Sequence, residues 1–455
     1  MLQQVVEAAG RFVVCPKTRK PRLWAMVLVA LGLRLAVMGF LYGEQLETKR
    51  DHWPFGYEVG RIARSIALGK GYGNPLFEDT GPTAWMPPVY PYILAGVFKT
   101  FGVYTVASAF AILSLQALMS ALTCLPIYFI ALRSFGERAA LSAGWLWAFF
   151  PYGIYFPVER IWPTWLATLL LAILFLMTLR LEDTSSAWDW AAFGLLWGVT
   201  ALTEPSVISV LLPLATWAGY RLYTQRCRSV SHVAARMAVA AVAFIVTVSP
   251  WFIRNYRTFH QFIPFRDNLG LELRVGNNGD NSTWANYDIG PWHSDVEWEQ
   301  FKQIGEVKYM AEKKQQALEF MSGHPGYVAW STVRRIGYVW TGFWSLDRRY
   351  LADEPLDPPN ILLCTALTIF ALIGLRRAFR TNAVQAMPYA LVLLFFPVVY
   401  YITHPEVYYR RPIDPFLLVL AVYAVTPRHE PSQGQPLDDE EVVPESLFIA
   451  DVIND

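Results

Sequence analysis

The first candidate for acid–base chemistry is a carboxylate in the segment RDHWPFGYEVGRIARSIALGKGYGNPL, residues 50–76. Its apolar residues recur at helical spacing, which predicts a short amphipathic helix that ends at Gly69. On this helix Glu58 and Arg61 are three residues apart, the spacing of an ordinary surface ion pair. Glu58 could instead serve as a general base, because partial burial raises the pKa of a carboxyl group. Asp51, just before the helix, is the alternative base.

Basic side chains that suit a phosphate ligand occur as two arginine pairs far apart in the sequence. Arg254 and Arg257 follow a long apolar stretch, and Arg410 and Arg411 precede the last one. A guanidinium group binds phosphate oxygens through two parallel hydrogen bonds, so we expect these residues to hold the phosphate of a ligand. The alternative is anchoring in lipid headgroups, to which long basic side chains commonly extend.

Four further side chains are candidates for contact with a sugar or an acceptor. Trp85 and Tyr90 suit either stacking on a sugar ring or an aromatic belt at the membrane interface. Arg61 and Glu159 are the polar members of this group.

The sequence indicates neither a nucleotide site nor a dedicated metal site. We find no glycine-rich phosphate loop, no Asp-x-Asp in the predicted outer loops and no histidine pair with ligand spacing on a helix. We therefore name no metal ligand and no certain cofactor, and leave a divalent metal ion open. Arg34, inside the first apolar stretch, is a costly charge that could pair with Glu204 or face a cavity.

The composition places these residues in a polytopic membrane protein. Of 455 residues, 54% are hydrophobic and 16% are charged, against about 25% charged in a typical soluble domain. The net charge of +1 gives no global field that would attract nucleic acid. A helical span needs about 20 mostly apolar residues. Ten such spans are predicted, at residues 23–42, 106–132, 139–157, 162–179, 188–203, 206–222, 235–253, 360–375, 384–402 and 413–426.

The lysines and arginines of the short loops set the expected orientation. If ten spans alternate, these loops fall on one side together with both termini, and we expect that side to be the cytoplasm. We divide the chain into a transmembrane catalytic module, 1–253, whose first outer loop is 43–88, and a large outer loop or cap, 254–358. C-terminal transmembrane helices, 359–426, and a disordered acidic cytoplasmic tail, 427–455, follow.

The cap is expected to be small and rich in helices. Alternating leucines between Leu269 and Val275 suggest one strand. The apolar spacing from Phe301 predicts one or two helices that end at His324. Two apolar segments broken by Pro, Lys or Arg, 88–102 and 327–345, are expected at the membrane interface.

Three stretches resemble bacterial membrane glycosyltransferases of the GT-C superfamily. They are FGYEVGRIARSIALGKGY followed by WMPPVYPYILAGVFKTFG, then SPWFIRNYRTFHQFIPFRDNLGLELRVGNN, and finally YYRRPIDPFLLVLAVY. The group they resemble most is glycosyltransferase family 39 with the protein-mannosyltransferase-like proteins, to which the lipid A aminoarabinose transferase is related. Many relatives carry an adjacent Asp-Glu pair in the first outer loop, and this chain has Glu58 in the matching helix with Asp51 seven residues earlier.

The resemblance implies an all-α GT-C bundle of about ten or more transmembrane helices with a small α-rich cap of outer loops. It implies an inverting transfer of a sugar from a polyprenyl-phosphate donor to a glycan, lipid or protein acceptor. The reaction would occur at the outer face of the bacterial inner membrane, among membrane lipids, with an acidic base and with basic residues on the donor phosphate.

Two other functions remain open at this point. A transporter or flippase of a lipid-linked glycan would use the same cavity and arginines without making or breaking a bond. A non-catalytic assembly subunit would depend on neither carboxylate. Sugar transfer by the purified protein in liposomes distinguishes the enzyme from both.

Overall fold

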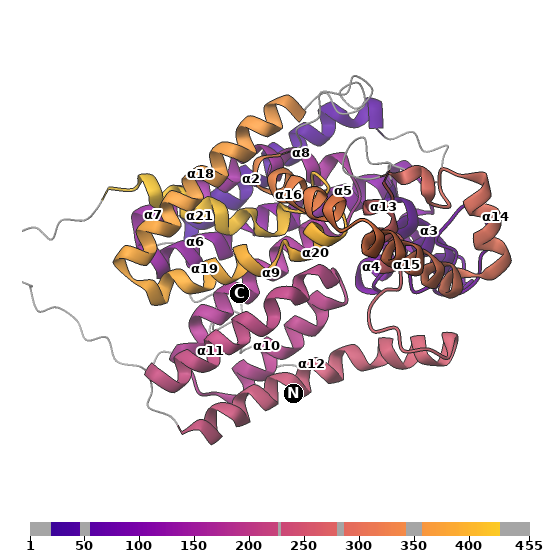
Figure 1. Ribbon diagram of the computed structural model, residues 1–455. Helices are drawn as coiled ribbons and strands as arrows, with labels where there is room; N and C mark the ends of the chain where they lie inside the picture. The colour runs from indigo at the N-terminus through magenta and orange to yellow at the C-terminus, as the bar shows by residue number, and fades with distance from the viewer. Residues whose placement is uncertain (1–19, 46–54, 226–228, 280–285, 343–356, 428–455) are drawn as a thin grey trace, which may run out of the picture. The chain divides into compact units, whose positions relative to one another are not determined.

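The computed structural model describes residues 20–45, 55–225, 229–279, 286–342 and 357–427, and within these ranges the chain is helical (Figure 1). Their strand-like pairing is confined to an isolated bridge between Gly73 and Pro82. The described residues up to Val425 form one compact unit. Asp51 and nearly all of the predicted acidic tail lie outside the described residues.

Six helical stretches of the described chain are long and apolar enough to cross a membrane, and each overlaps one of the predicted spans. The helices that form them are α2 (Lys20–Gln45), α5 (Val106–Leu122), α6 (Cys124–Phe135), α9 (Thr164–Arg180), α12 (Val230–Phe259), α18 (Asp357–Thr381), α19 (Ala383–Phe395) and α20 (Val398–Ile402). The helices α5 and α6 together make one of these stretches, as do α19 and α20.

The other four predicted spans are shorter helices. Span 139–157 is split into α7 (Glu137–Ala148) and α8 (Pro151–Glu159), because Pro151 suits a first helical turn and interrupts a helix interior. The remaining three correspond to α10 (Ala187–Ala201), α11 (Leu211–Gln225) and α21 (Asp414–Val425). α21 is buried from Asp414 to Val422, so its apolar character serves packing against other helices.

Glycines allow two helix pairs to approach closely. A Cβ atom on Gly194 of α10 would lie 1.9 Å from the Ala240 carbonyl oxygen of α12. A Cβ on Gly374 of α18 would meet the Leu420 carbonyl of α21 at the same distance. Membrane helices commonly pack with their backbones close together at small residues.

Arg34 lies buried inside the bundle. It donates to Ser120 Oγ at 2.9 Å and to the carbonyl oxygens of Ala30 and Ala148 at 2.8 and 3.2 Å. Of the two alternatives for Arg34, pairing with Glu204 is therefore wrong: a hydroxyl group of α5 and carbonyl oxygens of α2 and α7 satisfy this guanidinium instead.

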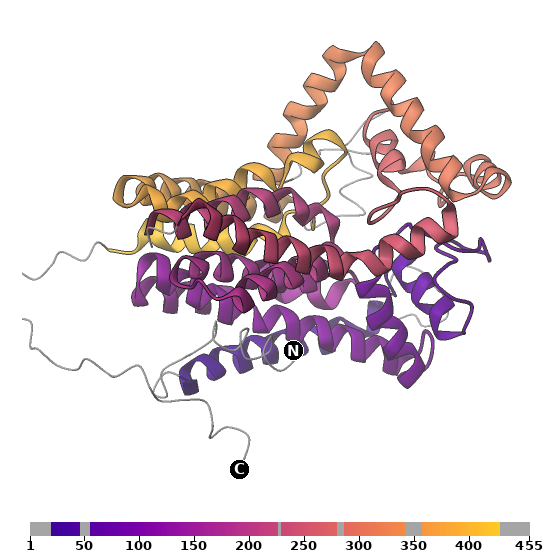
Figure 2. The ribbon, with the colours of Figure 1, turned by 90° about the horizontal axis from the view of Figure 1, so that it is seen from below.

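A second group of helices surrounds its own apolar core. It comprises α3 (Tyr57–Ala67), α4 (Val89–Phe101), α13 (Leu269–Gly276), α14 (Asp295–Ile304) and α15 (Glu306–Gly323). Phe55, Val59, Trp85, Phe301 and Tyr309 are among the buried residues of this core. α15 and α16 (Pro325–Thr341) diverge from the turn at His324 (Figure 2). The interfacial segments predicted at 88–102 and 327–345 are the helices α4 and α16.

The strand expected from Leu269 to Val275 is wrong, since this segment is the helix α13. A Cβ on Gly270 would lie 2.1 Å from the Met310 carbonyl oxygen, and one on Gly276 would lie 2.0 Å from that of Thr403. The helix is thus packed on two sides, and the alternation of leucines over seven residues reflects burial rather than a pleated strand. The helices predicted to end at His324 are confirmed as α14 and α15.

Candidate active site

The position of Glu58 is set by the tight start of α3. Gly56 has φ +83°, and a Cβ there would lie 2.5 Å from the Ile161 carbonyl oxygen in the loop between α8 and α9. Glycine is therefore required at this contact. Val59, Ile62 and Ala63 of α3 are buried, while Glu58 is half-buried in the first turn.

Glu58 lies in surroundings that favour its neutral form. Burial raises the pKa of its carboxyl group to about 7. The nearby Arg61 acts in the opposite direction, and the negative charge of Glu272 adds to the rise. A carboxyl group with a pKa near 7 is well matched to accept a proton at neutral pH.

Arg160 and Tyr408 lie near Tyr57, the residue before Glu58. Burial raises the pKa of Tyr57 to about 12, while the charges of Arg160, Glu58 and Arg61 also act on its hydroxyl. The Arg160 guanidinium lies 4.6 Å from the centre of the Tyr408 ring, a cation–π distance. Tyr408 also interacts electrostatically with Tyr57 and Glu272. Three segments that are distant in sequence thus meet at Tyr57.

Glu272 of α13 is held by two hydrogen bonds. His404 Nε2 lies 2.6 Å from Glu272 Oε2, and Asn268 Nδ2 donates to Oε1 at 2.8 Å. Burial alone would raise the pKa of Glu272, but the hydrogen bond and charge of His404, with the charge of Arg266, hold it below its usual value. Glu272 is therefore the ionised carboxylate beside Glu58.

Arg266 is the guanidinium group of this region that has the fewest protein partners. Burial would lower its pKa, but the carboxylates of Glu204 and Glu272 raise it. Across the described ranges Arg266 has no hydrogen bond or ion pair within 4.0 Å. Sequence reasoning missed Arg266, although it lies in the quoted stretch FIPFRDNLG. No local pattern in the sequence shows that this guanidinium lies near carboxylates without forming an ion pair with them.

The first predicted arginine pair lies at the end of α12. Arg254 donates to the carbonyl oxygens of Thr83 and Tyr72 at 2.7 and 2.8 Å, and it thereby holds the segment between α3 and α4. Arg257 is exposed. Neither residue has a described contact with Glu58.

The second predicted pair is buried next to Asp414. Arg410 Nε lies 3.0 Å from Asp414 Oδ1, and Arg411 Nη1 lies 2.8 Å from Oδ2. The Arg411 guanidinium also stacks 3.5 Å from the centre of the Tyr152 ring. Sequence reasoning missed Asp414, although its spacing of three and four residues from the two arginines is the spacing of ion pairs on a helix.

The structure also places the four candidates for sugar or acceptor contacts. Trp85 is buried against Trp292 and Phe301, and the Tyr90 hydroxyl donates to Gln116 at 2.6 Å, so both belong to the core.

The two polar candidates lie near Tyr57. Arg61 is buried with its guanidinium 4.6 Å from the centre of the Phe77 ring. Glu159 Oε2 lies 3.5 Å from Arg160 Nε, and burial raises the pKa of Glu159.

A buried carboxyl pair joins the first outer loop to the cap. Glu306 accepts from Thr83 Oγ1 at 2.5 Å and from the Ala84 amide at 2.6 Å. Burial raises the pKa of both Glu306 and Asp267, and the negative charge of Asp267 raises that of Glu306 further. No group of three His, Cys, Asp or Glu side chains in the described residues could hold a metal ion.

Comparisons with known proteins agree with this architecture. The family model for dolichyl-phosphate-mannose-protein mannosyltransferase matches residues 86–253. The apo oligosaccharyltransferase of Archaeoglobus fulgidus is 13% identical, with a TM-score of 0.52 over 89% of this chain and 50% of that one. Its complex with zinc and sulfate gives 14% identity and a TM-score of 0.48 over 88% and 48% of the two chains.

A third solved structure is ArnT from Cupriavidus metallidurans bound to undecaprenyl phosphate, at 14% identity and a TM-score of 0.37 over 86% of this chain and 76% of that one. The present chain spans about half the length of the oligosaccharyltransferase. No curated protein matches it by sequence.

Proposed function

We propose that this integral membrane protein of the GT-C superfamily is a glycosyltransferase that takes its sugar from a polyprenyl-phosphate donor. The observation that carries the proposal is the position of Glu58, a half-buried carboxyl group with a pKa of about 7. It lies close to Arg61 and to Glu272 of α13, and Glu272 in turn interacts with Arg266. The matching family acts with a dolichyl-phosphate sugar, which is a polyprenyl-phosphate donor.

In the proposed reaction the Glu58 carboxylate accepts the proton of an acceptor hydroxyl. The freed oxygen attacks the anomeric carbon while the bond from that carbon to the phosphate oxygen breaks, which inverts the centre. Polyprenyl phosphate leaves with the electron pair, and its growing negative charge requires a cation nearby.

Arg266 is the residue that we propose for this charge, because its donors are not used by a carboxylate within 4.0 Å in the described chain. Arg257, Arg254, Arg410 and Arg411 stay candidates for donor binding, with Arg257 the most accessible of them. For Arg254 and for the pair beside Asp414, the contacts favour a positioning role in the loops around the site.

We assign a role in the choice of acceptor to the cap. The helices α13 to α15 surround the same apolar core as α3, and α13 itself carries Glu272. We propose that a glycan, lipid or protein acceptor approaches between the cap and the first outer loop at the outer face of the membrane. Trp85 and Tyr90 would shape this region from its core, and Arg61 and Glu159 stay proposed contacts for polar groups of the ligands.

The test uses purified full-length protein in liposomes with a panel of radiolabelled polyprenyl-phosphate hexoses and pentoses and with cell-envelope extract as acceptor. The expected result is release of polyprenyl phosphate with label in the acceptor, abolished by Glu58→Gln and retained by Glu78→Gln, an exposed carboxylate of the same loop. Movement of intact labelled lipid across the bilayer without release would identify a flippase. Loss of transfer in Asp51→Asn with retention in Glu58→Gln would assign the base to Asp51.

A further inference from the structure

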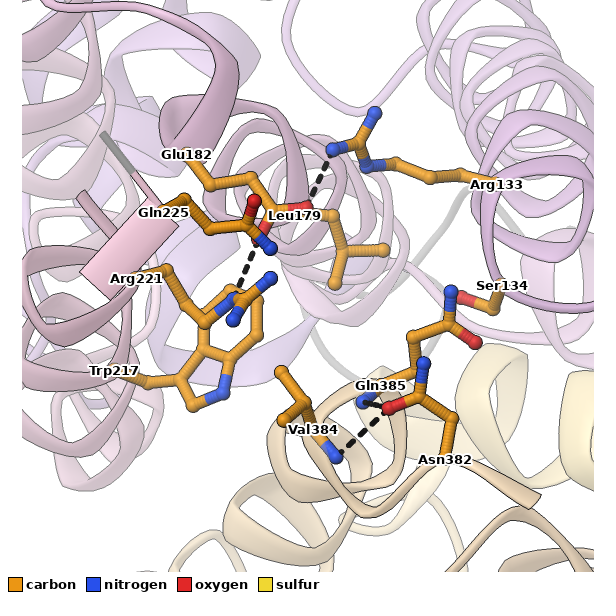
Figure 3. A pocket seen from close by; sticks show the side chains of 10 residues that line it. All are labelled: Arg133, Ser134, Leu179, Glu182, Trp217, Arg221, Gln225, Asn382, Val384 and Gln385. Atoms are coloured by element: carbon orange, nitrogen blue, oxygen red, sulfur yellow. Dashed lines mark hydrogen bonds and ion pairs between the residues drawn. The ribbon is translucent and has the colours of Figure 1, made fainter. Parts of the chain in front are cut away.

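A polar cavity lies at the end of α9 that is far from Glu58. α9 has 17 residues and is therefore about 25 Å long. Arg160, which adjoins the candidate active site, lies just before its first residue, whereas Glu182 follows its last turn. Glu182 lines a cavity of about 320 Å³ between the ends of α6, α9, α11 and α19 (Figure 3). The cavity is thus remote from the proposed chemistry.

Two arginines face each other across Glu182 in this cavity. Arg133 Nη2 donates to Glu182 Oε1 and Arg221 Nε donates to Oε2, both at 2.6 Å (Figure 3). Each carboxylate oxygen is therefore occupied by a guanidinium group. Arg133 has a second ion pair, at 2.8 Å, with Asp183, whose side chain is 58% exposed.

The Nη donors of Arg221 are bound by an uncharged group rather than by Glu182. Its Nε atom makes the ion pair, and its two Nη atoms lie beside the side-chain amide of Gln225. The cavity wall also includes Gln385 and Trp217 (Figure 3). A neutral amide is a weak partner for a guanidinium compared with an oxyanion, so these donors are suited to an anionic ligand.

The balance of charge around the cavity is positive. Arg180 lies close enough to interact electrostatically with Arg133 and Asp183. Three arginines thus face the two carboxylates Glu182 and Asp183. Because the cavity opens at the ends of membrane-crossing helices, it lies where lipid headgroups carry their phosphates.

We propose that this cavity binds a phosphate oxyanion, held by Arg221 and Arg133, with the amides of Gln225 and Gln385 as further donors. The phosphate can come from the headgroup of an anionic lipid or from free phosphate. The short loops rich in arginine predict that this end faces the cytoplasm, so an occupied cavity would tie α6, α9, α11 and α19 together at the inner leaflet. The site is independent of the proposed transfer reaction.

The experiment measures lipid binding by native mass spectrometry of the full-length protein released from phosphatidylcholine nanodiscs that contain phosphatidylglycerol. The wild type is expected to retain phosphatidylglycerol in preference to phosphatidylcholine. Arg221→Gln should weaken this retention about tenfold or more, the effect of losing a charge-assisted contact. Val384→Trp, at the cavity wall, should do the same by filling the space without changing any charge. Arg138→Gln removes an exposed arginine from the start of α7 and is the matched control.

Added inorganic phosphate separates the two sources. Displacement of the retained lipid by millimolar phosphate would show that the cavity also binds the free ion. Resistance to displacement would show that the cavity is a site for the lipid headgroup. Either result supports a phosphate site in the cavity. Equal retention in the wild type, Arg221→Gln and Val384→Trp overturns the proposal, as does a lack of preference for phosphatidylglycerol. If Arg221→Gln does not fold, Val384→Trp decides alone.

Discussion

Replacing Glu58 with glutamine should abolish sugar transfer and at the same time stabilise the protein at alkaline pH. Burial raises the pKa of Glu58 from 4.5 to about 7, which corresponds to roughly 3 kcal/mol against the charged form. Since solvent reaches part of this side chain, that figure is an upper bound. Glutamine has nearly the same shape and carries no charge at any pH.

The direction of the pH dependence follows from this pKa. The folded protein holds the Glu58 proton up to about pH 7, whereas the unfolded chain releases it near 4.5. The stability contributed by the proton is therefore present at low pH and is lost as the pH rises through this interval. Glu58→Gln should remove the loss, so that the variant matches the wild type at pH 4.5 and exceeds it at pH 8.5.

Two assays check the two halves of the prediction. Thermal unfolding in detergent at pH 4.5, 6.5 and 8.5 should show the stability gain only at the higher values, with Glu78→Gln as the exposed control. Transfer by the wild type should rise with pH to a plateau with an apparent pKa near 7, and Glu58→Gln should lower it by about 100-fold or more. A variant that retains a tenth of the wild-type rate, or one equally destabilised at all three pH values, would refute this reasoning.

Three further changes are expected to have distinct effects. Arg266→Gln should reduce transfer by roughly 100-fold through loss of charge stabilisation, and Arg266→Lys should recover part of it, as measured by release of polyprenyl phosphate. Asp267→Asn should flatten the fall in thermal stability between about pH 4 and 6. The raised pKa of Asp267 gives stability that is lost as its proton leaves, and asparagine has no such proton. An unchanged pH dependence of the melting temperature would contradict the raised pKa. Arg34→Met should lower the free energy of unfolding by roughly 1–3 kcal/mol, and with it the apparent melting temperature, while the pH profile of transfer keeps its wild-type shape. A shifted pH profile would connect Arg34 to the site.

Local patterns in the sequence were sufficient to predict the class of fold and the helix that carries Glu58. Long apolar stretches must become helices in a bilayer, because every backbone polar group needs an internal partner there. The periodicity of residues 55–67 likewise gave a helix with one apolar face and a carboxylate beside it. The same patterns failed at α13, where burial on two sides produced an alternation like that of a strand.

Which charged groups meet was decided largely by the tertiary structure. Arg410 and Arg411 lie next to Asp414, Arg254 binds the carbonyl oxygens of the first outer loop, and Arg266 lies between carboxylates of other segments. The sequence shows only that each arginine is present and lies near a predicted span. By that criterion all of these arginines are equivalent candidates for binding a phosphate. The surroundings of Arg254 and Arg266 depend on packing between different segments, whereas Arg410 and Arg411 find Asp414 only four and three residues away. The free energy of each charge depends on its partner and on burial.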